Sequence, residues 1–403
     1  MGRAVRCVIA MGLAMLLLAA AAGAVAPPIT EYGAGITPNS AVEDIAAGPD
    51  GNLWFTEAAG NRIGKITPSG VVTEYGAGIG SDAGPNAITV GPDGNLWFTE
   101  IDGKIGRITP AGVVTEFSAG LTPRSFPSGI AAGRDGNLWF TESTDRIGRI
   151  TRAGVITEFS AGITPGSSPF GIAAGRDGNM WFTEDQGGIG RITPTGVVTE
   201  YTKGITDDSG PTLIALGPDG NLWFTEIRAD QIGKITRSGV VTEYGTGITE
   251  GSAPTGIVAG PDGNLWFTEY ANDTLGKITP AGAITEYGGL TDGSGPGGIA
   301  LGRDGNLWFT ESDTNRVGRA ALPHAPTVKV TVAIKGKGRV TGGRISCPGK
   351  CRATVASGAR LILRASPARG YRFAGWSGAC KGSRACTLRP RAAVKVTATF
   401  RRG

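Results

Sequence analysis

Seven glutamates recur in this sequence at intervals of 42 or 43 residues, each ending a copy of the segment Trp-Phe-Thr-Glu. Carboxylates can transfer protons or hold cations, so a sevenfold acidic ring is one interpretation. Each copy is followed seven or eight residues later by a lysine or arginine, and further on by a second carboxylate such as Glu74 or Glu116. Charge pairing across neighbouring strands is the interpretation that we favour. The seven glutamates are Glu57, Glu100, Glu142, Glu184, Glu226, Glu269 and Glu311.

Histidine and cysteine are almost absent from the repeated region. The one histidine, His324, lies in Leu-Pro-His-Ala-Pro, whose prolines indicate a linker. Residues 27–322 contain no cysteine. A Ser-His-Asp set, a Cys-His pair and a histidine-based metal site are therefore excluded from this region.

The spacing of the tryptophans predicts the strands on which the repeated glutamates lie. A period near 42 with short alternating segments is typical of a four-stranded propeller blade. Residues 85–117 contain four such segments, rich in Val, Ile, Thr, Phe or Trp and separated by Gly, Pro, Asp or Asn. We expect four antiparallel strands per unit, innermost first, with the tryptophans packed between blades. They are Trp54, Trp97, Trp139, Trp181, Trp223, Trp266 and Trp308.

The ends of the repeat predict how the ring closes. Thr-Glu-(Tyr/Phe), which marks the outer strand, also occurs seven times, but its first copy, at residues 30–32, precedes the first tryptophan. The last unit has no outer strand after it. We therefore predict an all-β, seven-bladed β-propeller over residues 27–322, in which the N-terminal strand completes the last blade. An open β-solenoid, the alternative, leaves the displaced strand unexplained.

The positions that differ between blades are the candidate binding residues. They follow the proline of Pro-x-Gly-Ile at the start of each inner strand, beside the central channel, where pockets form in closed β folds. Glu43 and Asp44 form an acidic pair suited to a cation or basic group, with solvated loop carboxylates as the alternative. Phe170 could stack on a ligand or plug the channel. The candidates are Glu43, Asp44, Asn86, Ser128, Phe170, Thr212 and Thr255, and Gly297 occupies the position in the last blade.

The repeated text "GPDGNLWFTE…RIGRIT…GVVTEY" resembles the streptogramin B lyase family, also called virginiamycin B lyase, over residues 29–322. The resemblance implies a propeller enzyme that opens a cyclic depsipeptide by elimination across its ester, with Mg²⁺ and a general-base histidine. The family's two histidines and a glutamate fall on Thr255, Gly297 and Gly295 here. Only Glu311 could match the family's remaining catalytic glutamate. Threonine and glycine cannot replace a histidine base, and Glu43 is the one carboxylate near the mouth that could.

After a Pro-rich linker at residues 323–328, the composition changes. Residues 327–403 hold 18 Lys and Arg with no Asp or Glu, whereas residues 27–326 hold 19 basic and 34 acidic residues, so the formal charges are +18 and −15. The segment from Phe373 to Cys380 carries most of a resemblance to the divergent internalin-type B-repeat module, which implies a small β domain at 329–403. Such a charge attracts polyanions, or docks the module against its own acidic propeller. We expect anionic cell-envelope polymers as partners, in preference to nucleic acid.

Four cysteines in this small domain indicate two disulfides. Proximity in sequence favours Cys347–Cys351 and Cys380–Cys386 among the three possible pairings. A four-cysteine zinc site is the alternative.

The first 26 residues indicate a cleavable secretory signal: Arg3 and Arg6, then an apolar run from Val8, then small residues around Ala24. About 15 apolar residues are fewer than the ~20 that a membrane-spanning helix needs. We expect a secreted or cell-surface monomer that binds an unknown ligand at the propeller mouth, without an assigned cofactor. The alternative is a working lyase that uses Mg²⁺ and confers antibiotic resistance.

Overall fold

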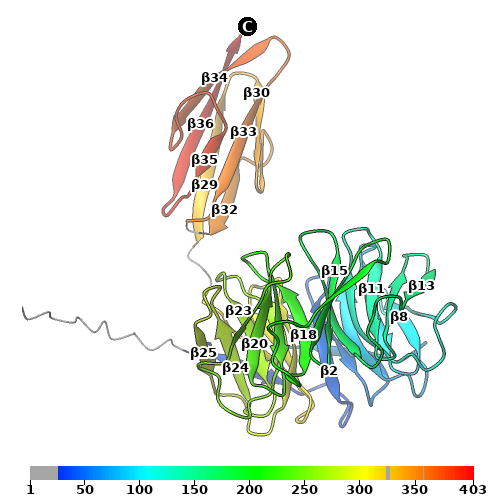
Figure 1. Ribbon diagram of the computed structural model, residues 1–403. Helices are drawn as coiled ribbons and strands as arrows, with labels where there is room; N and C mark the ends of the chain where they lie inside the picture. Colours follow the sequence, from blue (N-terminus) through cyan, green and yellow to red (C-terminus); the bar gives the residue numbers. More distant parts are fainter. Residues whose placement is uncertain (1–25, 324–326, 357) are drawn as a thin grey trace, which may run out of the picture.

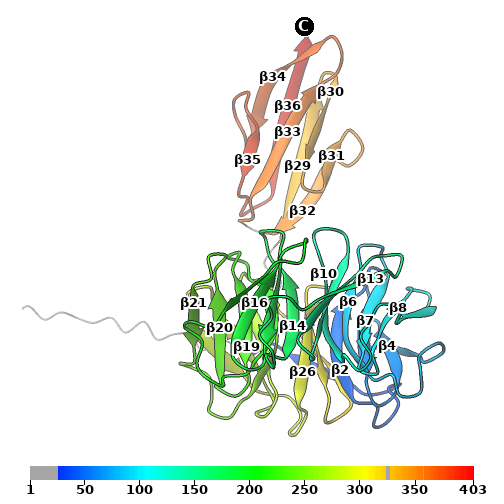
Figure 2. The same ribbon diagram turned by 45° about the vertical axis from the view of Figure 1, so that its right-hand side comes forward.

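The computed structural model describes residues 26–323, 327–356 and 358–403 (Figure 1). The expected signal, apart from Ala26, and His324 lie outside these residues. Residues 29–320 form seven four-stranded sheets around one axis, and residues 327–402 form a second all-β body (Figure 2). None of the described residues lies in a helix that could cross a bilayer.

The innermost strand of each blade begins at the proline of Pro-x-Gly-Ile, or at Val42 in the first blade. Proline is tolerated there because the first residue of a strand need not donate to the ladder. The pairing with the second strand shifts between this residue and the isoleucine, so two residues at the channel are left out of register. The inner strands are β2 (Val42–Ala47), β6 (Pro85–Val90), β10 (Pro127–Ala132), β14 (Pro169–Ala174), β18 (Pro211–Leu216), β22 (Pro254–Ala259) and β26 (Pro296–Leu301).

The second strand of each blade is buried along its whole length. Its tryptophan packs into the core of the next blade: Trp97 lies in one cluster with Leu138 and Phe140, and Trp308 in one with Leu53 and Phe55. The expected packing between blades is confirmed. The second strands are β3 (Leu53–Glu57), β7 (Leu96–Glu100), β11 (Leu138–Glu142), β15 (Met180–Glu184), β19 (Leu222–Glu226), β23 (Leu265–Glu269) and β27 (Leu307–Glu311).

The third strand carries the repeated cation, whose partner differs from the expected carboxylate. In the first blade, Lys65 lies 5.1 Å from the ring centres of both Trp54 and Tyr75. The other six cations lie in the same way over a tryptophan and an outer-strand ring. The predicted pairing of these cations with the repeated glutamates is wrong, because the cations lie over the negative faces of the stacked rings. Charge pairing across neighbouring strands is present with other cations, as between Lys104 and Glu116 at 2.9 Å. The third strands are β4 (Arg62–Ile66), β8 (Lys104–Ile108), β12 (Arg146–Ile150), β16 (Gly188–Ile192), β20 (Gln231–Ile235), β24 (Thr274–Ile278) and β28 (Arg316–Ala320).

The outer strand of the last blade is supplied by the N-terminal end of the propeller. Strand β1 (Ile29–Tyr32) pairs antiparallel with β28, so this blade has the order β1-β28-β27-β26. Tyr32 stacks on Trp308 at 5.6 Å between ring centres, as the outer-strand ring does in the other blades. The predicted seven blades and their closure are confirmed. The other outer strands are β5 (Val72–Tyr75), β9 (Val114–Phe117), β13 (Ile156–Phe159), β17 (Val198–Tyr201), β21 (Val241–Tyr244) and β25 (Ile284–Tyr287).

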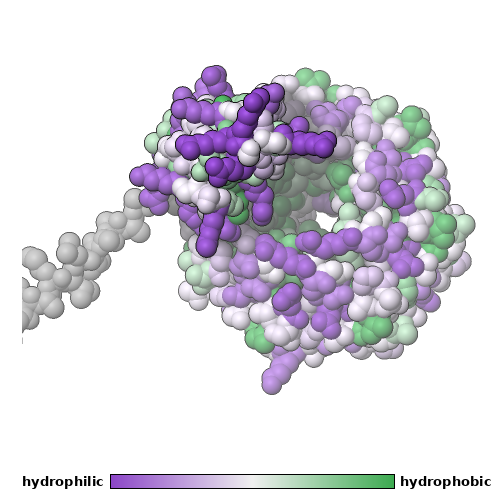
Figure 3. Space-filling view, turned by 90° about the horizontal axis from the view of Figure 1, so that it is seen from above, coloured by the Kyte–Doolittle hydropathy of each residue, from purple (hydrophilic) through white to green (hydrophobic). Residues whose placement is uncertain are grey.

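Because the strands alternate in direction, the two faces of the propeller differ. One face, here called the mouth face, holds the starts of the inner strands and the loops after the second strands. The chain leaves the propeller after β28, on the opposite face, which holds the Asp-Gly turns. Figure 3 looks onto that opposite face, and a hollow with apolar walls opens at its centre.

The C-terminal module consists of two four-stranded sheets packed on one core. The core contains Val330, Leu363, Trp376 and Phe400. Both expected disulfides are present, Cys347–Cys351 and Cys380–Cys386. The first strand begins at Thr327, so residues 327 and 328 belong to the module and not to the linker. The sheets have the orders β32-β29-β36-β34 and β31-β30-β33-β35. The strands are β29 (Thr327–Lys335), β30 (Gly338–Gly342), β31 (Ile345–Cys347), β32 (Arg352–Ala356), β33 (Leu361–Pro367), β34 (Tyr371–Gly378), β35 (Cys386–Leu388) and β36 (Val394–Arg402).

Candidate functional site

A ring of hydrogen bonds fixes the start of every inner strand. The threonine before each repeated glutamate is buried, and its hydroxyl donates to a carbonyl in the next blade, as Thr99 does to Ser128 at 2.6 Å. The Thr99 hydroxyl oxygen also accepts the backbone N–H of Ala87 in its own blade at 3.0 Å. The accepting carbonyl belongs to the variable residue after the proline. The threonines are Thr56, Thr99, Thr141, Thr183, Thr225, Thr268 and Thr310. The backbone is thus held by the repeat, and the variable side chains are free to differ.

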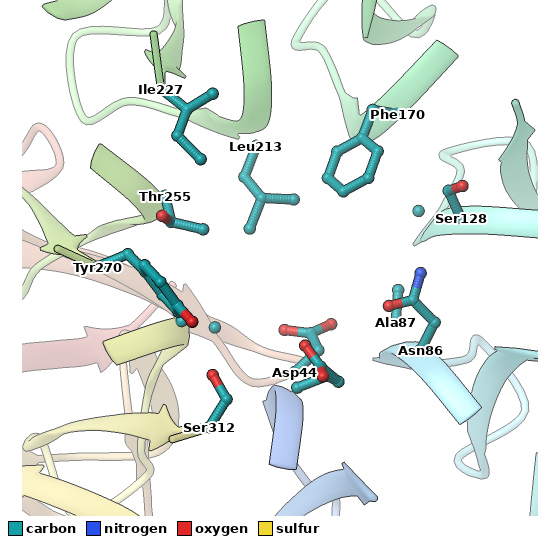
Figure 4. A pocket seen from close by; sticks show the side chains of 14 residues that line it. Asp44, Asn86, Ala87, Ser128, Phe170, Leu213, Ile227, Thr255, Tyr270 and Ser312 are labelled. Carbon is teal, nitrogen blue, oxygen red and sulfur yellow. The ribbon is translucent and has the colours of Figure 1, made fainter. Parts of the chain in front are cut away.

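These variable side chains surround a cavity of about 280 Å³ at the mouth of the propeller (Figure 4). Six of the seven candidate binding residues line it, together with Gly297. The six are Glu43, Asp44, Asn86, Ser128, Phe170 and Thr255. Residues that are far apart in sequence therefore meet at one site because seven equivalent strand ends converge on one axis.

Thr212 is the candidate that does not line the cavity. It is buried, and its hydroxyl oxygen lies 2.9 Å from that of Thr225. Leu213, which stands where most blades have glycine, lines the cavity in its place. The expectation for Thr212 is therefore corrected.

Seven further lining residues were missed by the sequence reasoning: Ala87, Gly129, Leu213, Ile227, Tyr270, Gly298 and Ser312. Ile227, Tyr270 and Ser312 each follow a repeated glutamate directly, at a position that also varies between blades. Comparing that second variable position across the repeats could have found these three.

Two carboxylates, Glu43 and Asp44, line one side of the cavity, and a third, Asp313, lies near enough to Glu43 for its charge to act there. Asp44 accepts the backbone N–H of Ile45 at 2.8 Å and of Ile88 at 2.9 Å. Burial raises the pKa of Asp44 to about 6, against the effect of these two hydrogen bonds. Burial also raises the pKa of Glu43, and the charges of Asp44 and Asp313 raise it further. Two of these acids come from the start of β2 and the third from the loop after β27.

Apolar side chains form the opposite wall. Phe170, Leu213 and Ile227 lie across the cavity from Asp44 (Figure 4). The Phe170 side chain projects into this space with 37% of its surface exposed. The cavity therefore has two chemically different sides.

The repeated glutamates lie outside the cavity. All seven are buried, none lines the cavity, and each has at least one oxygen without a hydrogen-bond partner among the described residues. Burial raises the pKa of Glu311 to about 8, and the charge of Glu31 adds to the effect. Glu311 thus resembles its six equivalents in burial and position. The structure gives it no feature that sets it apart as a catalytic residue.

Comparison with known protein families identifies the family to which the propeller belongs. The virginiamycin B lyase family matches residues 24–204 and 188–325. The chain belongs to the virginiamycin B lyase family. The divergent InlB B-repeat domain matches residues 328–403. No curated protein matches the chain.

Solved structures of this family are similar over the propeller. A streptogramin B lyase is 37% identical, with 72% of this chain and 96% of that chain covered and a TM-score of 0.67. Virginiamycin B lyase from Staphylococcus aureus is 37% identical, with 73% and 99% covered and a TM-score of 0.68. A catalytically inactive variant of the Staphylococcus aureus enzyme, with quinupristin, is 36% identical, with 73% and 99% covered and a TM-score of 0.67.

The positions that the family resemblance assigns to catalysis hold other residues. Thr255 and Gly297 line the cavity, and Asp313 and Tyr270 occupy the space where a side chain at Gly295 would project. Among the described residues, no group of three or more His, Cys, Asp or Glu could hold a metal ion. The residues present at these positions therefore do not fit the Mg²⁺ that the resemblance implies.

Proposed function

We propose that this protein binds a ligand in the mouth cavity and does not catalyse the ring opening associated with its family. The observation that carries the proposal is the pair Thr255 and Gly297, which line the cavity where the resemblance implies histidines. The cavity itself is intact and lined by side chains that differ from blade to blade. We infer that this cavity serves for binding without the base.

The chemistry of elimination supports this proposal. Proton abstraction next to a carbonyl needs a base whose pKa is near the working pH. Threonine and glycine offer none. The ring-opening step also depends on the metal in the family resemblance, and the donor set for that metal is replaced here. No catalytic step is therefore assigned to these positions.

We also propose an extracellular location, reached through the N-terminal signal. The two disulfides of the module are consistent with an oxidising compartment. The extracellular domain of a two-component system from B. thetaiotaomicron shares the fold at 13% identity, with 91% of this chain and 60% of that chain covered and a TM-score of 0.59.

Incubation of the purified protein with a type B streptogramin and Mg²⁺ is expected to leave the antibiotic cyclic. Elimination yields a ring-opened product of unchanged mass, so chromatography coupled to mass spectrometry detects it by retention and fragmentation. The Staphylococcus aureus virginiamycin B lyase serves as the positive control. Ring-opened antibiotic above the level of a boiled sample contradicts the binding-only function.

A lyase with a carboxylate base, and hence a resistance function, is the second candidate. One observation favours it: burial and two neighbouring acids raise the pKa of Glu43 inside the cavity. The same assay separates the candidates. If ring opening occurs and Glu43→Gln abolishes it, Glu43 is the base.

We propose in addition that the C-terminal module attaches the protein to anionic envelope polymers. Lys329, Arg344, Lys350 and Arg352 line one hollow of about 290 Å³ on the module, and all four are exposed. The module contains no acidic residue that could pair with them. Repeated phosphates along a polymer would each find a cation there.

Reversing two charges in this hollow is expected to weaken binding of the full chain to teichoic-acid-bearing wall fragments by about tenfold, since two ion contacts become repulsive. The variant is Lys350→Glu with Arg352→Glu, and Arg391→Glu with Lys395→Glu is the charge-matched control. Co-sedimentation is measured from about 50 mM salt, where the screening length exceeds ~10 Å, to about 500 mM. Equal losses in both variants, or tighter binding to DNA than to wall fragments, argue against this hollow as an envelope site.

A further inference from the structure

We infer that the ligand of the mouth cavity is an organic cation, an amine attached to an aromatic or aliphatic body. This inference rests on the proposed function and names the chemical class that the cavity selects. It follows from the acidic and apolar walls of the cavity and from the blades that supply their residues.

The acidic side offers a place for one positive charge. Glu43 and Asp44 stand at the start of β2, and Asp313 is held in the neighbouring loop by the hydroxyl of Tyr270, which lies 3.0 Å from both of its carboxylate oxygens. Glu43 forms no hydrogen bond or ion pair through its side chain with any described residue. An ammonium group has three donors and one charge, which suit carboxylates brought close together.

The protein supplies no cation of its own to this side. Among the described residues that line the cavity, none is lysine or arginine. Arg228, next to lining residue Ile227 in sequence, is held by Asp185 at 2.8 Å and Asp208 at 3.2 Å. The acids therefore repel one another without a counter-charge in the cavity, and a cationic ligand relieves that repulsion.

The apolar side offers a surface for the body of such a ligand. Phe170 is partly exposed at the cavity, where water contacts apolar surface that an aromatic or aliphatic group would cover. Leu213 and Ile227 extend the same wall (Figure 4). An inorganic ion would satisfy the acids but leave this wall wet, so the geometry favours a ligand with both parts.

The repeat shows that both walls are departures from the common pattern. Asp44 and Leu213 each stand where most blades carry glycine, and Tyr270 and Asp313 stand at loop positions that vary. Acids gather on the first and last blades, and apolar groups on the fourth and fifth. A sevenfold scaffold thus carries a one-sided distribution of charge, as a single asymmetric ligand requires.

Three matched probes test the inference on the full chain: 4-phenylbutylamine, the neutral 4-phenylbutanol and the anionic 4-phenylbutyrate. Isothermal titration at pH 7.5 is expected to show the amine binding at least about tenfold more tightly than the alcohol, with no binding of the acid. Glu43→Gln should reduce the preference for the amine, because it removes one charge from a side chain without a partner. Asp207→Asn, an exposed acid in the loop before β18, is the matched control and should change nothing.

Phe170→Ala provides a second readout because it should weaken the amine and the alcohol equally. Lowering the pH to 5 should reduce the amine's advantage as Asp44 and Glu43 take up protons; Tyr270 lines the same cavity, and Asp313 is hydrogen-bonded to it. Equal binding of amine and alcohol overturns the cationic class but leaves a binding cavity. A preference that survives in Glu43→Gln at full strength, or no binding of either probe at millimolar concentration, overturns the inference; the last result also counts against the proposed function.

Discussion

Deleting residues 27–33 is expected to lower the melting temperature of the propeller by about 10 °C or more. The deletion removes β1, which supplies the outer strand of the last blade and the ring that stacks on Trp308. Loss of a fully buried aromatic side chain costs about 3–5 kcal/mol, and the partly buried Tyr32 contributes less, but the backbone hydrogen bonds of β1 are lost with it. Each kcal/mol shifts the melting temperature of a domain of this size by about 2–4 °C. The deletion also breaks the ion pair between Glu31 and Arg316 at 3.0 Å.

A point variant gives the same test without an altered chain end. Tyr32→Ala removes the stacking ring, and Val113→Ala, at a side chain that is 62% exposed, is the matched control. Differential scanning calorimetry measures both, and Tyr32→Ala should account for a large share of the loss. A deletion variant that melts at the temperature of the full chain rules out β1 as the closing strand.

The propeller is expected to be more stable at pH 5.5 than at pH 8.5, by at least several kcal/mol. Burial, the largest cause, raises the pKa of Glu57, Glu100 and Glu226 to about 8, as it does for three of their equivalents, and that of Glu142 to about 7. Nearby outer-strand carboxylates such as Glu243 raise the value further. In the unfolded chain, the same groups titrate near 4.3.

The direction follows from proton linkage. Between about pH 4.5 and 8, the folded state keeps protons on these glutamates that the unfolded state releases, so the free energy of unfolding falls as the pH rises. Each such proton changes it by about 1.4 kcal/mol per pH unit. Groups with lowered pKa values act below this window: burial opposes the shift in Asp50, but hydrogen bonds from Asn52 and Trp54 hold its pKa below the usual range.

Urea unfolding at both pH values measures the change in the free energy of unfolding. One substitution tests whether a buried glutamate causes it. Glu226→Gln copies the protonated side chain and can keep the hydrogen bond that Ser209 donates at 2.7 Å. It should be near neutral at pH 5.5 and stabilising at pH 8.5. Glu250→Gln, at an exposed loop position, should be neutral at both. Stability that is level or rising between pH 5.5 and 8.5 is the result that contradicts buried, protonated glutamates.

The sequence alone was enough to predict half of the residues that line the candidate site. The period of 42 residues, the displaced first strand and the variable position after the proline predict six of the cavity residues. The prediction for Thr212 was wrong because sequence spacing does not show which way a side chain points within a β-bulge. Leu213 lines the cavity, whereas the Thr212 hydroxyl hydrogen-bonds to that of the buried Thr225. The prediction for the repeated cations was wrong for a related reason, since their aromatic partners come from two different strands, the second and the outer strand.

What the sequence determined by itself was the architecture: seven blades, the closing strand, the two disulfides and the absence of histidine from residues 27–322. These features depend on local patterns, because strand period, turn residues and residue identity can be read directly from the local sequence. Only the tertiary structure decided which side chains face one another. It brought Asp313 beside Glu43 across a blade boundary and set Phe170 opposite Asp44. It also buried seven glutamates without full hydrogen bonding. Such pairings depend on how seven sheets converge on one axis, and only the closed ring fixes the distances and the burial that set charge, pKa and binding.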